Sequence, residues 1–415
     1  MNGASSNRRV YRGARLIDPT QSLDQKADLW VADELIVAVG TAPDGADEFE
    51  SVDVSDCWIS AGLIDLSARV LGNPETELKA ASAGGISQLL CPPDAHFIPD
   101  TPSEVRDRLN QLSICDTRVH LLGALTRHQA GEQLTDQAAL RAAGCVGLSD
   151  GGRSIADTRV LRSAMAYAAS LGITLFLQPQ DRDLADGCAH DGAIATRLGL
   201  PAIPAVAETV DMARILALAA DTGARIHLTR VSSAAGVTML EKAKADGLAV
   251  TADVAVHQLF LTEQDLVGFN AQCHVHPPLR STGDREALIR AVASGTIDAI
   301  CSDHTPLPDD AKLAPFADSE AGISGLETLL PLGLRLVEDD RITLSQLIER
   351  TVIGPANALG LDPIGLVPGL PIHELIAFAP VKSWRPTDQH WQSFGHNTPL
   401  SNWQFDGRAS ALSPK

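Results

Sequence analysis

The sequence lacks the features that would place a protein in or across a membrane. No stretch approaches the roughly 20 apolar residues of a membrane span, and the start is polar and basic, without the apolar run of a signal peptide. No low-complexity tract is present. The seven cysteines are an odd number and none forms a Cys-x-x-Cys pair, which favours buried free thiols in a reducing cytoplasm. We therefore expect a cytoplasmic protein without membrane contact.

Positive charge is also scarce. The 33 lysine and arginine residues are outnumbered by 52 aspartate and glutamate residues, and the formal net charge is −19. A surface this acidic repels nucleic-acid phosphates and anionic membranes, so we expect no nucleic-acid partner. The charge suits a basic protein partner, although plain solubility is the simpler explanation of the charge alone.

What the chain does contain is an ordinary globular composition, with 45% hydrophobic and 20% charged residues in 415. This length suits one large domain and a smaller one. Short apolar runs alternate with helical patterns from residue 63 onward. The eight runs are 63–66, 86–90, 119–122, 145–148, 173–177, 226–229, 249–254 and 297–301. Such alternation predicts a parallel sheet buried on both faces, and eight units predict a closed (β/α)8 barrel.

The segments between these runs are rich in alanine, leucine and charge. They predict helices at 78–83, 103–112, 138–143, 157–170, 207–222, 234–246 and 285–293. Glycines often close them, as helix C-termini prefer, and Asp157 and Ser233 are expected N-caps. The chain before about Ser60 predicts short strands with turns, and residues 374–379 predict another strand. The expected fold class is therefore α/β.

Several motifs occur in a fixed order along nearly the whole chain. They are Ala61-Gly62-Leu63-Ile64-Asp65, Ala83-Gly84-Gly85-Ile86, residues 197–208, Pro277-Pro278-Leu279-Arg280, Asp303-His304, and Asn397-Thr398-Pro399 followed by Trp403. Each is weak evidence alone, but the ordered set resembles the long-chain dihydroorotases of the amidohydrolase superfamily. The resemblance implies that residues 61–362 form the barrel and that residues 1–60 and 363–415 pair as a small β-sandwich domain beside it.

The family that this chain resembles binds one or two divalent metals at the barrel mouth. The resemblance implies a His-x-His pair after the first strand, a Lys or Asp after the fourth, one His each after the fifth and sixth, and an Asp after the eighth. Such ligands leave a position for a water whose pKa the metal lowers. The last Asp accepts the proton of that water.

The sequence departs from this pattern at every histidine. The aligned positions hold Ser67, Arg69, Asp150, Gln178, Arg230 and Asp303. An arginine stays protonated and has no lone pair to give to a cation, and two arginines bring about two positive charges into the space of the metals. We therefore expect no metal, no other cofactor and no dihydroorotase activity.

The positions that align with the family's substrate site have changed as well. Asp94 stands in place of an Asn, and its charge would repel an anionic substrate. His276 replaces another Asn, and Leu307 replaces a His. The Arg that holds the substrate carboxylate in the family has no counterpart in the shortened segment after the first strand. Loss of both sets of residues is what relaxed selection on catalysis would leave.

Asp150 and Asp303 are the two carboxylates that remain at these positions. Closely placed buried carboxylates need compensating charge once a metal is gone. We expect them to pair with Arg69 and Arg230 across the barrel mouth rather than to face water as idle carboxylates. The arginines would then replace the charge of the metal and keep the barrel mouth folded, so an Arg230→His variant is expected to have lower thermal stability.

Other residues near the strand ends carry less weight. His257 and His304 are expected to be hydrogen-bonded residues of the barrel rim rather than catalytic groups. His274 and His276 form a His-x-His motif, but they lie in a loop and no third ligand completes a zinc site. Ser67 lacks an evident His base, which disfavours a serine nucleophile.

Some bacterial relatives of the long-chain dihydroorotases are inactive subunits of an aspartate carbamoyltransferase complex, and this chain looks like such a subunit. The resemblance implies a scaffold for the catalytic chains of that enzyme in pyrimidine biosynthesis, in a hetero-oligomer expected to be dodecameric; a homodimer is also compatible. Two alternatives stay open. One is an amidohydrolase with a rebuilt site for another cyclic amide or imide. The other is a free-standing binder like the inactive dihydropyrimidinase-like proteins of animals.

Overall fold

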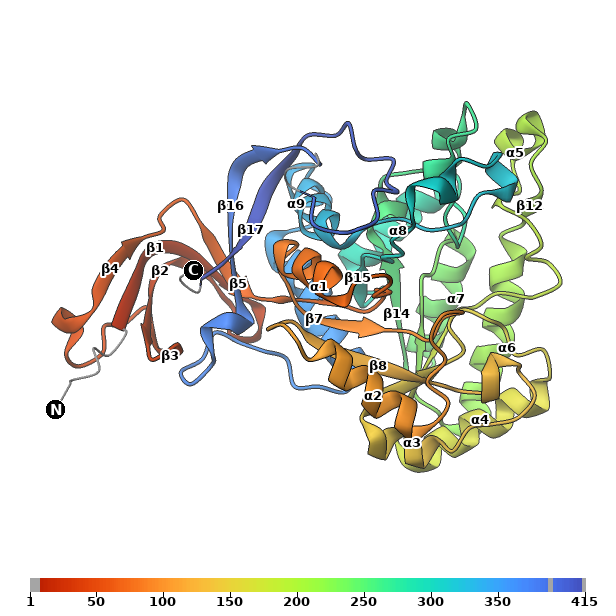
Figure 1. The fold of residues 1–415 in the computed structure, drawn as a ribbon, viewed down its shortest axis with the longest axis horizontal. Coiled ribbons are helices and arrows are strands. Elements are labelled where there is room, and N and C mark those ends of the chain that lie inside the picture. Colours follow the sequence, from red (N-terminus) through yellow and green to blue (C-terminus); the bar gives the residue numbers. More distant parts are fainter. Residues whose placement is uncertain (1–7, 387–390, 413–415) are drawn as a thin grey trace.

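The computed structural model describes residues 8–386 and 391–412. It shows a β-sheet domain at one end of the molecule and a barrel with surrounding helices at the other (Figure 1). This arrangement confirms the predicted α/β fold class, a (β/α)8 barrel with a small β domain. Within the described ranges, no helix is long and apolar enough to cross a membrane. Five of the cysteines are buried.

Eight parallel strands form the barrel. They are β6 (Leu63–Asp65), β7 (Ile86–Cys91), β8 (Arg118–Ala124), β9 (Cys145–Ser149), β10 (Thr174–Leu177), β13 (Ile226–Leu228), β14 (Val250–Ala255) and β15 (Ala299–Cys301). Their order in the sheet is β15-β14-β13-β10-β9-β8-β7-β6. Each strand overlaps one of the eight apolar runs, so the predicted strands are confirmed. Their residues are mostly buried, as strands covered on both faces require.

The barrel closes through the residues that follow its first and last strands. Ala68 forms a parallel bridge with His304. The N–H of His304 donates to the carbonyl of Ser67 at 2.9 Å, and the N–H of Arg69 donates to the carbonyl of His304 at 2.9 Å. The seam of the barrel therefore passes directly beside two of the candidate site positions.

Helices surround the barrel (Figure 1). Those that match predicted segments are α1 (Pro74–Ala83), α2 (Pro102–Leu112), α3 (Gln137–Ala143), α4 (Thr158–Leu171), α6 (Val206–Thr222), α7 (Ala234–Ala245) and α8 (Thr282–Ser294). The side chains of Asp157 and Ser233 accept hydrogen bonds from the backbone of α4 and α7, which confirms both N-caps. The sequence analysis did not predict α5 (Ala193–Leu198), α9 (Leu329–Glu338), α10 (Leu344–Ile348), α11 (Gly354–Leu359), or the short strands β11 (Ala189–His190) and β12 (Ala202–Ile203).

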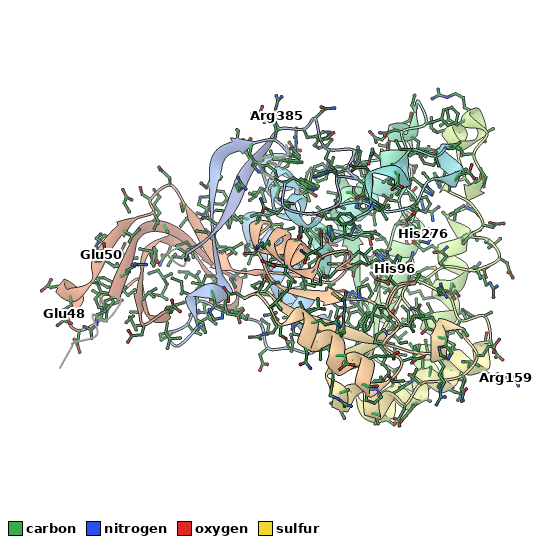
Figure 2. The ribbon with its side chains drawn as sticks, viewed as in Figure 1. Glu48, Glu50, His96, Arg159, His276 and Arg385 are labelled. Carbon is green, nitrogen blue, oxygen red and sulfur yellow. The ribbon has the colours of Figure 1, made fainter. Side chains whose placement is uncertain are left out.

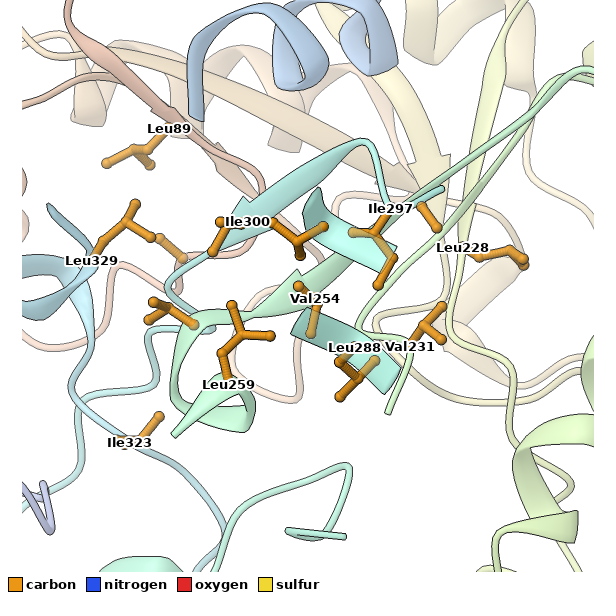
Figure 3. Close-up of a cluster of buried hydrophobic side chains, with 14 of the residues drawn as sticks. Leu89, Leu228, Val231, Val254, Leu259, Leu288, Ile297, Ile300, Ile323 and Leu329 are labelled. Carbon is orange, nitrogen blue, oxygen red and sulfur yellow. The ribbon is translucent and has the colours of Figure 1, made fainter. Parts of the chain in front are cut away.

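Aliphatic side chains fill the region around the last two barrel strands. Val254 on β14 and Ile300 on β15 are fully buried, and Leu259 and Ile297 lie in the same cluster (Figure 3). Burying one such side chain contributes about 1.5–3 kcal/mol. The apolar core therefore holds the ends of these strands, which carry the polar residues, in fixed positions.

The small domain joins the two ends of the chain in one sheet. Its strands are β1 (Arg8–Asp18), β2 (Leu23–Ala32), β3 (Leu35–Val39), β4 (Glu50–Asp53), β5 (Trp58–Ala61), β16 (Leu375–Trp384) and β17 (Phe405–Ala411). The order is β17-β16-β5-β1-β2-β3, with β4 also beside β1. Antiparallel pairing of β16 with β5 connects the C-terminal segment to the N-terminal one, as the resemblance implied.

Candidate functional site

Arg230 and Asp303 form an ion pair at the barrel mouth, where they follow β13 and β15. Nη1 of Arg230 donates to Oδ1 of Asp303 at 2.7 Å, and the side chains are only 8% and 5% exposed. Nη2 of Arg230 donates to Oε1 of Gln178, which follows β10. Burial acts to lower the pKa of Arg230, but the charge of Asp303 and its hydrogen bond outweigh burial and the pKa is raised. The pairing expected for Asp303 is confirmed.

Two further side chains converge on the same carboxylate. Nη1 of Arg69 lies 3.8 Å from Oδ1 of Asp303 and donates to Oγ1 of Thr305 at 2.8 Å. The hydroxyl of Ser67 donates to Oδ1 of Asp303 at 3.3 Å. Burial and the charge of Arg230 lower the pKa of Arg69, and Asp303 partly offsets them. Two guanidinium groups thus share one carboxylate. We call Arg69, Arg230 and Asp303 the arginine centre; it carries one net positive charge.

Asp150 does not belong to this centre. Its Oδ1 accepts the backbone N–H groups of Leu125 and Thr126, both at 2.9 Å, and its Oδ2 accepts the Thr126 hydroxyl at 2.5 Å. Burial raises the pKa of Asp150, and these hydrogen bonds oppose the rise. The predicted pairing of Asp150 with an arginine is therefore wrong, because the segment after β8 supplies three donors to the carboxylate.

The backbone at the ion pair is held in an unusual conformation. Arg230 has φ 56° and Asp303 has φ 51°, in the left-handed region that L-residues seldom adopt. Each such residue costs of order 1–3 kcal/mol, so the surrounding structure must enforce it. One source is Asp253, whose Oδ1 accepts the N–H of Arg230 at 2.6 Å and whose Oδ2 contacts Nε2 of His227 at 3.0 Å. This carboxylate, which the sequence analysis did not single out, positions the arginine.

The two rim histidines differ from each other. His304 is fully buried; its Nδ1 accepts the N–H of Gly325 at 3.1 Å, and its Nε2 lies 2.7 Å from the Glu77 carboxylate. Because Nδ1 accepts, Nε2 carries the proton and donates to Glu77. The expectation of a hydrogen-bonded rim histidine is confirmed for His304. It is wrong for His257, which is 1% exposed and has no partner for either ring nitrogen among the described residues. Burial lowers the pKa of His257 to about 4.

The His-x-His motif does not form one site. Nδ1 of His274 contacts the Ser319 hydroxyl at 2.9 Å, and its ring stacks on Phe316. His276 lies in the barrel part of the molecule (Figure 2), and its Nε2 contacts Oε1 of Gln180. The two rings therefore serve different neighbours.

Of the remaining candidate positions, His276 and Asp94 interact with the arginine centre, and Leu307 contacts the C-terminal segment. The carbonyl of His276 accepts from Nη1 of Arg230 at 3.4 Å. Asp94 is half-buried; its Oδ1 accepts the backbone N–H groups of residues 96 and 97, and its charge acts to raise the pKa of Arg69. The N–H of Leu307 donates to Oδ1 of Asn397 at 2.9 Å, which ties this position to the C-terminal segment.

The side chains at the mouth do not fit a divalent metal. The positively charged Arg230 is bonded to the carboxylate of Asp303 and to the amide oxygen of Gln178, and a guanidinium has no lone pair for a cation. Across residues 8–386 and 391–412, no group of three or more His, Cys, Asp or Glu side chains could hold a metal ion. The donors that a zinc-type site requires are thus replaced by a cation and its partners.

The fold is a (β/α)8 barrel beside a small β-sheet domain, and the barrel mouth holds an ion pair in the place of a set of metal ligands. A family model described as dihydro-orotase-like matches residues 58–236. A "Dihydroorotase-like protein" of Pseudomonas aeruginosa is 43% identical over 408 residues, which are 96% of either chain, and a "Dihydroorotase" of Geobacter sp. is 34% identical over 413 residues, again 96% of either chain. The solved L-hydantoinase of Arthrobacter aurescens has the same fold, with a TM-score of 0.82, 20% identity, and coverage of 96% of this chain and 92% of that one. The chain belongs to the dihydroorotase-like family of amidohydrolases.

Proposed function

We propose that this chain is a non-catalytic dihydroorotase-like subunit that scaffolds and stabilises aspartate carbamoyltransferase in de novo pyrimidine biosynthesis. The observation that carries the proposal is the buried ion pair of Arg230 with Asp303. In the family chemistry, the carboxylate at this position accepts a proton from a metal-bound water. In this chain the Asp303 carboxylate is paired with the guanidinium of Arg230, whose positive charge repels a metal cation. Neither the metal nor the free carboxylate base of the family reaction is then available.

The partner part of the proposal rests on the family and on the surface. A chain that has lost catalysis can still serve as a structural scaffold, because its folded barrel offers a fixed surface that holds other subunits in place. The net charge of −19 suits a partner with a basic face. The proposed assembly contains catalytic chains of the carbamoyltransferase, in a dodecamer located in the cytoplasm.

Size-exclusion chromatography with light scattering tests the proposal. The purified chain is measured alone and mixed with the aspartate carbamoyltransferase of the same organism, and the same sample is assayed for zinc content and dihydroorotase turnover. We expect a large mixed complex, no zinc above background and no turnover. Zinc together with turnover of dihydroorotate, or of another cyclic amide, would support the amidohydrolase alternative. A chain that ignores the carbamoyltransferase would contradict the scaffold role.

A further inference from the structure

A cavity of about 770 Å³ opens beside the arginine centre. It lies among the segments that follow β8, β9 and β10, and Gly131, Asp150, Gly152, Arg153, Gln180 and Arg182 are among its lining residues. This volume falls within the roughly 300–1,000 Å³ of small-molecule sites. Its two arginines are not at the positions that align with metal or substrate residues of the family. Asp150, which aligns with a metal-ligand position, also lines the cavity, so the cavity adjoins the old site and adds two arginines to it.

Two guanidinium groups line this cavity without an ion pair of their own among the described residues, although the charge of Arg153 acts to lower the pKa of the neighbouring Asp150. Arg153 and Arg182 are both exposed, and neither forms an ion pair within the part of the chain that the structure describes. Other exposed arginines of this acidic protein do form ion pairs: Arg159 pairs with Asp157, and Arg162 pairs with Asp221. A planar guanidinium that lacks a carboxylate partner is suited to bind a phosphate or carboxylate group.

The inner wall of the cavity adds a third source of positive charge. A Cβ atom on Gly152 would lie 3.2 Å from Nη2 of Arg230 and 2.6 Å from Oε1 of Gln178, and this glycine has φ 91°. The cavity wall thus contacts the arginine centre, whose net charge is positive. In addition, Nε of Arg230 is buried without a partner among the described residues. A buried charge that is only partly compensated attracts an opposite charge through the protein more strongly than it would through water.

We propose that this cavity binds a small anion through a phosphate or carboxylate group, held by Arg153 and Arg182 and attracted by the arginine centre. Asp150 also lines the cavity, but both of its oxygens accept hydrogen bonds from the segment after β8. The exposed Asp183 and Asp186 repel an anion and limit its affinity. This inference goes beyond the scaffold role and does not depend on it.

Isothermal titration of the purified full chain with orthophosphate, and separately with succinate, tests the proposal at an ionic strength held constant with sodium chloride. We expect saturable binding of at least one of the two anions. The double variant Arg153→Ala/Arg182→Ala is expected to bind at least about tenfold more weakly, since two charge-assisted contacts are lost. The matched control is Arg159→Ala/Arg162→Ala, which removes the same charge from α4; Arg159 lies at the outer edge of the barrel (Figure 2). Its affinity is expected to stay unchanged.

A second double variant tests whether the neighbouring carboxylates weaken anion binding. Asp183→Asn/Asp186→Asn removes only repulsion toward an anion, so we expect several-fold tighter binding. Binding of phosphate alone would identify a phosphate ligand, and binding of succinate alone a carboxylate ligand; either supports the proposal. No saturable binding, or equal weakening in the α4 control, would overturn it. The titration needs no carbamoyltransferase, so its failure would leave the scaffold role standing.

Discussion

Replacing Arg230 by methionine is expected to lower the free energy of unfolding by about 3–5 kcal/mol, because Asp303 then stays buried without its main countercharge. Methionine keeps much of the side-chain volume but supplies no donor for Asp303 or Gln178. Domains of this kind are stable by about 5–15 kcal/mol, so the loss is a large share of the total. Urea unfolding followed by circular dichroism measures it.

An exposed ion pair provides the control for the Arg230 experiment. Arg162 and Asp221 are 57% and 51% exposed, and their atoms lie 2.7 Å apart, so Arg162→Met is expected to cost less than about 1 kcal/mol. A further Asp303→Asn change in the Arg230→Met background removes the unpaired carboxylate and is expected to recover part of the loss. Equal losses in the Arg230 and Arg162 variants would mean that the buried pair does not hold the barrel mouth together.

The barrel was predictable because its strands are buried on both faces and therefore appear in the sequence as short runs rich in apolar residues. The helices after β15 were not predicted, and α9 shows why. It contains Pro331 and Gly333, which disfavour helix by intrinsic propensity. Tertiary packing overrides that preference: a Cβ atom on Gly333 would lie 2.5 Å from Cδ1 of Leu347 on α10. Close approach of two helices leaves no periodic signal in a single sequence.

The candidate site was predictable to the extent that strand ends determine it. Arg230 and Asp303 follow strands of the same barrel, so their side chains meet at one mouth. The partners of Asp150 were not predictable, since two of them are backbone N–H groups, at residues 125 and 126, and every residue type except proline has one. The lack of hydrogen-bond partners for the ring of His257 could not be predicted from the sequence either, because it depends on how the surrounding side chains pack in three dimensions.

That lack of partners leads to the second large effect: His257→Met is expected to stabilise the protein. Both ring nitrogens of His257 are buried without a hydrogen-bond partner among the described residues. A buried polar group left unsatisfied costs about 1–3 kcal/mol. Methionine has a similar volume, adapts to irregular spaces and has no polar hydrogen to satisfy. We expect the free energy of unfolding at pH 7.5 to rise by about that amount in urea denaturation.

The advantage of His257→Met is expected to grow in acid. Burial lowers the pKa of His257 in the folded protein to about 4 from its ordinary value of 6.5. Between these values the unfolded chain binds a proton that the folded protein does not, so the wild-type protein loses stability as pH falls from 6.5 toward 4. Each pKa unit corresponds to about 1.4 kcal/mol, which makes the loss from this group about 2 kcal/mol at pH 5. His257→Met lacks this imidazole and therefore does not lose that stability in acid.

His304 is the matched control, since it is also a fully buried histidine at the barrel mouth. Its ring nitrogens bond to Glu77 and to the N–H of Gly325, so His304→Met would leave the buried amide of Gly325 without this partner and would take one donor from the buried Glu77 carboxylate, which keeps Ser393 and the N–H of Phe394. We expect this variant to lose stability while His257→Met gains it. The same substitution would then change stability in opposite directions at two buried histidines, one with hydrogen-bond partners for its ring and one without. A loss in both variants would mean that the ring of His257 is satisfied in solution, by water or by a rearranged neighbour.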